Sequence, residues 1–244
     1  MAIDAGRSRP GRLVASGAGA THPGCQRALN EDALLTDPTG ALWAVSDGIG
    51  GLGHGDVAAD MVIEALTRIP HGATGPEPLV VALSGAHAAI RARGEAIGAT
   101  VVAALIGGDA AAVVWAGDSR CYLLRRGALV QVTRDHSVVQ DLVADGRLDP
   151  GQAEAHPEAH VITRAVGATD AFEPGHVTVP LDAGDRLLLC SDGLTRCVGA
   201  AEIAAILDGA ADPSDAVRAL VGAALARGAP DNVSVVVVGL MDAG

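Results

Sequence analysis

From residue 100 the chain reads Thr100-Val-Val-Ala-Ala-Leu-Ile106-Gly-Gly-Asp109-Ala-Ala-Ala-Val-Val-Trp-Ala116-Gly-Asp118-Ser119. The segments 100–106 and 111–116 are almost wholly apolar, and each is followed by a turn that contains glycine. Similar segments come at 121–125 and 129–133, divided by Arg126-Gly127. Short apolar runs separated by such turns are typical of antiparallel strands. The stretch therefore predicts an antiparallel meander.

Helices are expected on both sides of this strand-rich stretch. Apolar residues recur at helical spacing over 56–69, 79–93, 200–207 and 213–227, and a shorter helix is expected at 137–145. Further strands are expected at 34–36, 42–46, 177–179, 186–190 and 233–240. This order does not alternate strand and helix, so we expect an α+β fold with helices packed outside antiparallel sheets. One domain is expected over 13–244, after a flexible tail at 1–12.

The composition excludes several classes of function. The chain carries 17 basic and 29 acidic side chains, with a net charge of −12, so neither nucleic acid nor an anionic membrane is an expected partner. All the basic residues are arginines, which removes the lysine that P-loop ATPases and protein kinases use. The cysteines lack C-x-x-C spacing, and there is neither a signal peptide nor a membrane-spanning run. A cytoplasmic protein is therefore expected.

Acidic residues stand at the ends of several apolar runs. Four runs each end on an aspartate followed by a small or polar residue (Asp47, Asp118, Asp192 and Asp231), and another segment adds Glu31-Asp32. One Asp-Gly after a strand is usually only a turn, but rigid sheets can aim several carboxylates at one point. Close carboxylates repel one another, and divalent cations that select oxygen ligands, such as Mg²⁺ and Mn²⁺, relieve the repulsion. The pattern predicts a two-metal phosphoester hydrolase.

Arg27 and a glycine-rich loop lie next to these acidic residues. Arg27 alone would be an ordinary surface arginine, but beside an acidic cluster it suits a bidentate clamp on phosphate. Gly48-Ile-Gly50-Gly-Leu-Gly53 matches G-x-G-x-x-G, so a nucleotide-dependent oxidoreductase is an alternative. Against it, Asp47 would repel a pyrophosphate, and a second helix is expected where a parallel strand is required. The favoured interpretation is that the glycines let the backbone approach a metal, with the Gly48 carbonyl as a ligand.

The histidines give weaker signals. His156 and His160 have the spacing of paired ligands on a helix, but Pro157 lies between them, so a loop is expected rather than a metal site. His54 and His136 are expected in loops or behind the site, with a histidine acid near the site left open.

Taken in order, these motifs resemble the metal-dependent PP2C (PPM) family of protein serine/threonine phosphatases, with bacterial members the most similar. The similarity runs from about Gly24 to Leu240. It rests on Gly24-Cys-Gln-Arg27-Ala-Leu-Asn-Glu31-Asp32, Ser46-Asp47-Gly48-Ile-Gly-Gly51, Gly98-Ala-Thr100, Ala116-Gly-Asp118-Ser-Arg120, Asp135-His-Ser137, His160-Val-Ile-Thr-Arg-Ala-Val-Gly167, Cys190-Ser-Asp192-Gly193 and Asp231-Asn232.

The resemblance implies a four-layer α-β-β-α sandwich and a site with two Mn²⁺ or Mg²⁺ ions. Asp47 would bridge the two ions, and Asp192 and Asp231 would complete the protein ligands of the first. The Gly48 carbonyl and, through water, Glu31 would serve the second ion. The catalytic residues would be Arg27, which holds the substrate phosphate, and Asp32, which orients metal-bound water. Residues 146–160 would form a flap beside the site.

The substrates implied are proteins phosphorylated on serine or threonine by a kinase, attacked by a metal-activated bridging water. Ile49 stands where some relatives place a histidine, so the group that protonates the leaving oxygen stays open. Arg196 stands where relatives often have an aspartate that helps Asp118 hold a third metal. Arg196 would repel such a metal or pair with Asp118, so third-metal binding is expected to be weak or absent. The alternative function is a metal-binding pseudophosphatase that acts as a phosphoprotein scaffold.

Overall fold

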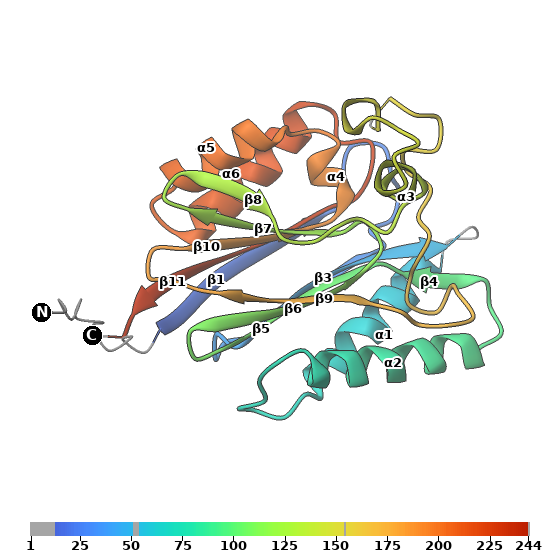
Figure 1. Ribbon diagram of the computed structural model, residues 1–244, viewed down its shortest axis with the longest axis horizontal. Helices are drawn as coiled ribbons and strands as arrows, with labels where there is room; N and C mark the ends of the chain where they lie inside the picture. Colours follow the sequence, from blue (N-terminus) through green and yellow to red (C-terminus); the bar gives the residue numbers. More distant parts are fainter. Residues whose placement is uncertain (1–12, 51–53, 154, 244) are drawn as a thin grey trace, which may run out of the picture.

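The computed structural model describes residues 13–50, 54–153 and 155–243, so the expected tail at 1–12 lies outside the described residues. Its strands form two antiparallel sheets (Figure 1). The five-stranded sheet has the order β1 (Leu13–His22), β11 (Val233–Asp242), β10 (Arg186–Cys190), β7 (Arg120–Arg125) and β8 (Ala128–Gln131). The six-stranded sheet has the order β2 (Asp32–Thr36), β3 (Leu42–Gly50), β5 (Val101–Gly107), β6 (Ala110–Ala116) and β9 (Gly175–Pro180), and β4 (Ile97–Ala99) pairs with β3.

Helices cover the outer face of each sheet, as Figure 1 shows. The pair α1 (Gly55–Thr67) and α2 (Glu77–Ala92) packs on the six-stranded sheet. The helices α5 (Ala200–Gly209) and α6 (Pro213–Ala226), with the short α4 (Asp192–Thr195), pack on the five-stranded sheet. The expected four-layer α-β-β-α sandwich is therefore confirmed. None of the helices in the described part of the chain has the length and apolar character that a bilayer crossing requires.

The central strands are apolar on both faces, because each face packs against another layer. In β11, Val236 and Val238 belong to the cluster between the sheets, whereas Val235 and Val237 belong to the cluster under α5 and α6. The alternation within an apolar run thus separates two cores rather than core from solvent. Trp43 of β3 and Trp115 of β6 are the largest side chains between the sheets, where most of the remaining residues are Val, Leu and Ala.

The expected meander is wrong at its centre. β6 belongs to the six-stranded sheet and β7 to the five-stranded sheet, so the chain crosses between the layers instead of turning back on itself. The crossing passes through Gly117, whose φ is +107°. A Cβ there would lie 2.6 Å from the side chain of Thr100, so the crossing needs glycine for its backbone conformation and for space.

The sequence patterns do not predict four elements of the described chain: β1, β4, α4 and the 3₁₀ turn Pro150–Gln152. The strand β1 has the sequence Leu-Val-Ala-Ser-Gly-Ala-Gly-Ala-Thr-His, without the bulky alternation that marks a strand. Its small residues have a packing reason. A Cβ on Gly17 would lie 2.6 Å from the Val237 carbonyl oxygen and 2.8 Å from the Trp43 ring, so a larger residue would push β1 away from β11.

The layered core predicts that truncating a side chain between the sheets lowers stability far more than truncating one outside them. Leu189 of β10 is fully buried, whereas Val130 of β8 is 59% exposed. We expect Leu189→Ala to lower the free energy of unfolding by about 2–5 kcal/mol, because it leaves a cavity in a rigid layer. Val130→Ala should change it by less than about 0.5 kcal/mol. Urea unfolding of the two variants measures both values, and similar losses would contradict this assignment of the core.

Candidate active site

The candidate site lies where the ends of the two sheets meet. In the six-stranded sheet, Asp32 of β2 stands directly opposite Asp47 of β3 in the strand register. In the five-stranded sheet, Asp192 follows β10 and Asp231 precedes β11. Asp118 lies in the crossing between β6 and β7. The structure thus brings together aspartates that are widely separated in the sequence, and their charges interact: Asp32, Asp192, Asp118 and Asp231 all raise the pKa of Asp47.

Burial and mutual repulsion disfavour the ionised forms of Asp32, Asp47, Asp118 and Asp192. Burial is the main cause in each case, and neighbouring carboxylates add to it. The pKa of Asp47 lies well above its usual value, that of Asp32 rises to about 6 and that of Asp118 to about 7. Burial also raises the pKa of Asp192, although the charge of Arg196 opposes the shift. The site therefore concentrates more negative charge than the protein alone neutralises.

Asp32 has one carboxylate oxygen without a partner. The Ser191 hydroxyl donates a hydrogen bond to Asp32 Oδ2 at 2.9 Å, and Ser191 Oγ in turn accepts from the Ser234 amide at 2.9 Å. Asp32 Oδ1 is buried and has no hydrogen-bond partner among the described residues. Buried carboxylate oxygens are normally paired, so a free one amid other carboxylates suits a cation or a water held by a cation.

Among residues 13–50, 54–153 and 155–243, no three acidic, histidine or cysteine side chains already form a metal-binding group. Two arginines hold part of the cluster instead. Arg27 Nη2 lies 3.0 Å from Asp231 Oδ2, and Arg196 lies 3.1 Å from Asp192 through Nε and 3.1 Å from Asp231 through Nη1. Of the two effects considered for Arg196, pairing with Asp118 is not found, because the guanidinium bridges Asp192 and Asp231 instead. The all-oxygen donor set fits a hard divalent cation once these arginines move aside.

Gly48 and Glu31 lie side by side at the start of α1. The Glu31 carboxylate accepts a hydrogen bond from the Gly55 amide at 2.9 Å, and the Gly48 amide donates to the Glu31 carbonyl at 3.1 Å. A Cβ on Gly48 would lie 2.3 Å from the Gly55 carbonyl, so glycine is required for this close approach of β3 and α1. A carboxylate at the positive end of the helix is well placed electrostatically.

The dinucleotide alternative is wrong. Residues 48–50 of the G-x-G-x-x-G pattern belong to β3, and residues 51–53 lie outside the described part of the chain. The helix α1 leads to α2, and all the strands that pair with β3 run antiparallel to it. A dinucleotide-binding unit needs a parallel strand after the helix, which this topology does not provide.

Sequence reasoning gave no role to Asn232, which ties the site together. Its side-chain oxygen accepts from the Glu31 amide at 2.8 Å, and its side-chain nitrogen donates to the carbonyls of Pro23 at 3.0 Å and Leu29 at 2.9 Å. Its own amide donates to the Asp231 carboxylate at 3.0 Å. One buried amide thus fixes the Arg27 loop against the start of β11. Its position directly after Asp231 was the available signal.

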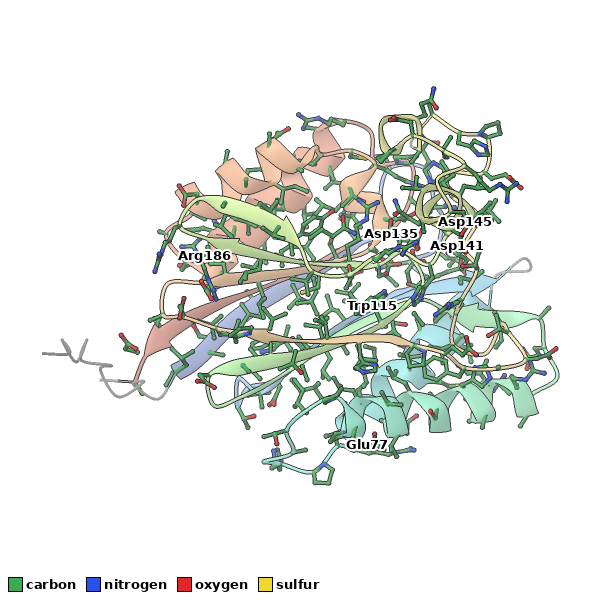
Figure 2. All side chains as sticks on the ribbon, in the orientation of Figure 1. Glu77, Trp115, Asp135, Asp141, Asp145 and Arg186 are labelled. Carbon is green, nitrogen blue, oxygen red and sulfur yellow. The ribbon has the colours of Figure 1, made fainter. Side chains whose placement is uncertain are left out.

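A cavity of about 540 Å³ opens beside the aspartates. Its polar lining includes Asp118, Arg120, Asp135, His160, Asp192 and Arg196. Arg120 holds Asp135 through two nitrogens, at 3.0 Å and 2.6 Å, and Figure 2 shows Asp135 at the same end of the sandwich as Asp141 of α3 (Val138–Ala144). His156 and His160 lie in turns, as expected, and not on a helix.

The segment 146–160 supplies Ala153, Ala159 and His160 to the cavity wall. Its regular structure in the described part is a single 3₁₀ turn, Pro150–Gln152. Nearby, His136 accepts a hydrogen bond from the Gly117 amide at 3.3 Å and stacks on Trp115, with ring centroids 5.9 Å apart. Burial lowers the pKa of His136 to about 4, so this imidazole is neutral near pH 7.

Comparison with known proteins identifies the family. The family model described as protein phosphatase 2C matches residues 18–227. The serine/threonine protein phosphatase PstP of Mycobacterium tuberculosis is 37% identical over 239 residues, which is 94% of this chain and 46% of that protein. The serine/threonine phosphatase stp of Listeria innocua is 33% identical, over 80% of this chain and 82% of its own. The chain belongs to the protein phosphatase 2C family.

Solved structures agree with this assignment. The crystal structure of the Mycobacterium tuberculosis PstP phosphatase has a TM-score of 0.88 and 37% sequence identity, and covers 93% of this chain and 99% of that one. The catalytic domain of PstP in complex with two manganese ions has a TM-score of 0.85 over 94% of this chain and 100% of that chain. This chain spans about half the length of the full PstP sequence.

The raised pKa of Asp118 predicts how the stability of the metal-free protein depends on pH. A carboxyl whose pKa is about 7 when folded and 3.8 when unfolded favours the folded state at low pH, and that contribution is lost as the pH rises toward 7. We expect Asp118→Asn to stabilise the protein relative to wild type by about 2 kcal/mol more at pH 8 than at pH 5. Urea unfolding in EDTA measures this, with the exposed Asp208→Asn as control. Equal effects at both pH values would contradict the assignment.

Proposed function

We propose that this chain is a metal-dependent protein phosphatase that hydrolyses phosphoserine and phosphothreonine. The observation that carries the proposal is the cluster of Asp32, Asp47, Asp118, Asp192 and Asp231. Burial raises the pKa of the first four carboxyls, which marks a site short of positive charge. Membership of the family supports it, as does the relative PstP, whose catalytic domain has been solved with two manganese ions. An acidic, oxygen-only site is suited to Mn²⁺ or Mg²⁺ and to phosphate ester chemistry.

The metal ligands follow from the same proposal. Asp47 would lie between two cations, with Asp192 and Asp231 completing the protein ligands of the first. The Gly48 carbonyl and, through water, Glu31 would serve the second. Bound there, the cations would supply a more acidic water and positive charge to offset the charge of the phosphate. In this proposal Asp118 binds a third cation only weakly. Position 196, where relatives often have an aspartate, carries an arginine and so supplies no second carboxylate.

Arg27 and Asp32 would act on the substrate and on the attacking water. Arg27 has a side chain 52% exposed, so once it releases Asp231 it can donate to two phosphate oxygens from the rim of the site. Asp32 Oδ2 accepts the hydrogen bond from Ser191, and Oδ1 is available to accept one from another donor. Ser191 holds Asp32 directly, and Asn232 holds the backbone on both sides of Arg27 through the carbonyls of Pro23 and Leu29. The segment 146–160 is proposed as a flap over the cavity.

The substrates would be proteins phosphorylated by a serine/threonine kinase, and the site of action the cytoplasm. All four cysteines are free, including the buried Cys121 and Cys190, which suits a reducing compartment. The net charge of −12 argues against nucleic acid as a partner. Within this proposal, residues 13–244 act as one phosphatase domain.

Hydrolysis assays test the activity. We expect turnover of p-nitrophenyl phosphate and of a phosphothreonine peptide that needs Mn²⁺ and falls at least about 100-fold in Asp192→Asn, because one ligand carboxylate is lost. Asp208→Asn removes the same charge from the exposed surface of α5 and should retain wild-type rates. A folded protein that binds Mn²⁺ yet turns over neither substrate would favour the scaffold alternative instead.

The role of Arg27 has a separate signature. At saturating Mn²⁺, Arg27→Gln should lower kcat/KM for the phosphothreonine peptide by about 10–100-fold, the worth of a charge-assisted bidentate contact. Much of the loss should appear in KM, since the arginine already contacts the phosphate of the bound substrate. Arg218→Gln, at an arginine with a side chain 76% exposed, is the matched control. An unchanged kcat/KM in Arg27→Gln would show that Arg27 does not contact the substrate phosphate.

A further inference from the structure

Arg196 occupies an unusual position for a positively charged side chain. It follows Asp192 by one helical turn, at the end of α4, so its guanidinium reaches back to that carboxylate. Nε lies 3.1 Å from Asp192 Oδ2, and Nη1 lies 3.1 Å from Asp231 Oδ2. A single planar group therefore bridges two carboxylates at the same end of the neighbouring strands β10 and β11. Under the proposed function, these two are the protein ligands specific to the first cation.

We infer that Arg196 is a built-in counter-ion that competes with the first divalent cation for Asp192 and Asp231. The inference rests on the proposed function, because it takes these aspartates as metal ligands. A cation bound through Asp192 Oδ2 or Asp231 Oδ2 would need the same oxygens that the guanidinium now contacts. Binding of the first cation through these oxygens therefore requires Arg196 to release them. The free energy lost when the ion pair breaks weakens the binding of the metal.

The compensation is confined to one half of the site. Asp231 receives both Arg27 and Arg196, and Asp192 receives Arg196. Among the described residues, no ion pair involves Asp32, Asp47 or Asp118. The arginines thus neutralise the ligands assigned to the first cation and leave the remaining carboxylates uncompensated. The two metal positions should consequently differ in affinity, with the first weakened selectively.

The structure provides room for the released side chain. Arg196 has a side chain 27% exposed and lines the cavity of about 540 Å³ beside the aspartates. Asp118 lines the same cavity, whereas the nearby Asp135 is already held by Arg120. A guanidinium released into this space would approach Asp118 and further disfavour a third cation there. Arg196 therefore acts on metal affinity in both of its positions.

Calorimetric titration of the metal-stripped protein with Mn²⁺ tests the inference. Wild type, Arg196→Gln and Arg218→Gln are compared, the last removing the same charge from the exposed face of α6. We expect Arg196→Gln to bind the first Mn²⁺ about tenfold more tightly than wild type, with Arg218→Gln unchanged. Arg196→Lys keeps the charge but cannot bridge two carboxylates in the same way. The affinity of this variant for Mn²⁺ should therefore lie between those of wild type and Arg196→Gln.

Thermal unfolding gives a second readout that does not depend on activity. In EDTA, Arg196→Gln should melt below Arg218→Gln, because the aspartates lose their counter-ion. In Mn²⁺ the order should reverse or the gap should close. Equal Mn²⁺ affinities in Arg196→Gln and Arg218→Gln would overturn the inference. So would a metal-free melting temperature unaffected by loss of Arg196.

The outcomes separate this inference from the proposed function. Tighter Mn²⁺ binding in Arg196→Gln without hydrolysis of either substrate would support the counter-ion while the phosphatase proposal fails. Metal-dependent hydrolysis with equal affinities would do the reverse. Absence of Mn²⁺ binding in wild type and in both glutamine variants would overturn both.

Discussion

Repulsion among partly buried aspartates at the meeting point of two sheets is the constraint on which the rest of this structure depends. The fold brings Asp32 and Asp47 into direct opposition across β2 and β3, and adds Asp192 and Asp231 from the other sheet. Such an arrangement costs stability unless positive charge enters. The layers of apolar side chains behind it are what make that cost tolerable, because they hold the strand ends in place. The packing of the core and the repulsion in the site thus contribute with opposite sign to the free energy of folding.

Much of the scaffold could be predicted from local patterns. The strands and helices are apolar at regular spacing, and the order of elements excludes a parallel sheet. The crossing between β6 and β7 could not be predicted, because the turn Gly117-Asp118-Ser119 is compatible with a hairpin and the close contact of Gly117 with Thr100 exists only in the folded protein. β1 was missed because Gly17 is required by Trp43 and Val237, residues distant in the sequence.

The candidate site divides in the same way. The aspartates could be found because each follows or precedes an apolar run, and the resemblance to a family supplied their order. The partners of Arg196 could not be found, since the choice among Asp118, Asp192 and Asp231 depends on how α4 is oriented. Asn232 lacked an assigned role because its bonds go to backbone groups of a loop about 200 residues away. Contacts of this kind leave no periodic signal.

The stacking of Trp115 on His136 gives the protein an optical reporter of its own. The chain has only two tryptophans, and both are buried between the sheets. Trp115 lies near the end of β6, the strand that leads to Asp118, and its indole nitrogen donates to the Arg134 carbonyl at 2.7 Å. Because the adjacent imidazole is neutral near pH 7, it lacks the charge that makes imidazolium a quencher of indole emission. Fluorescence from this ring therefore reports rearrangement of the segment between β6 and β7 that carries Asp118, without an added label.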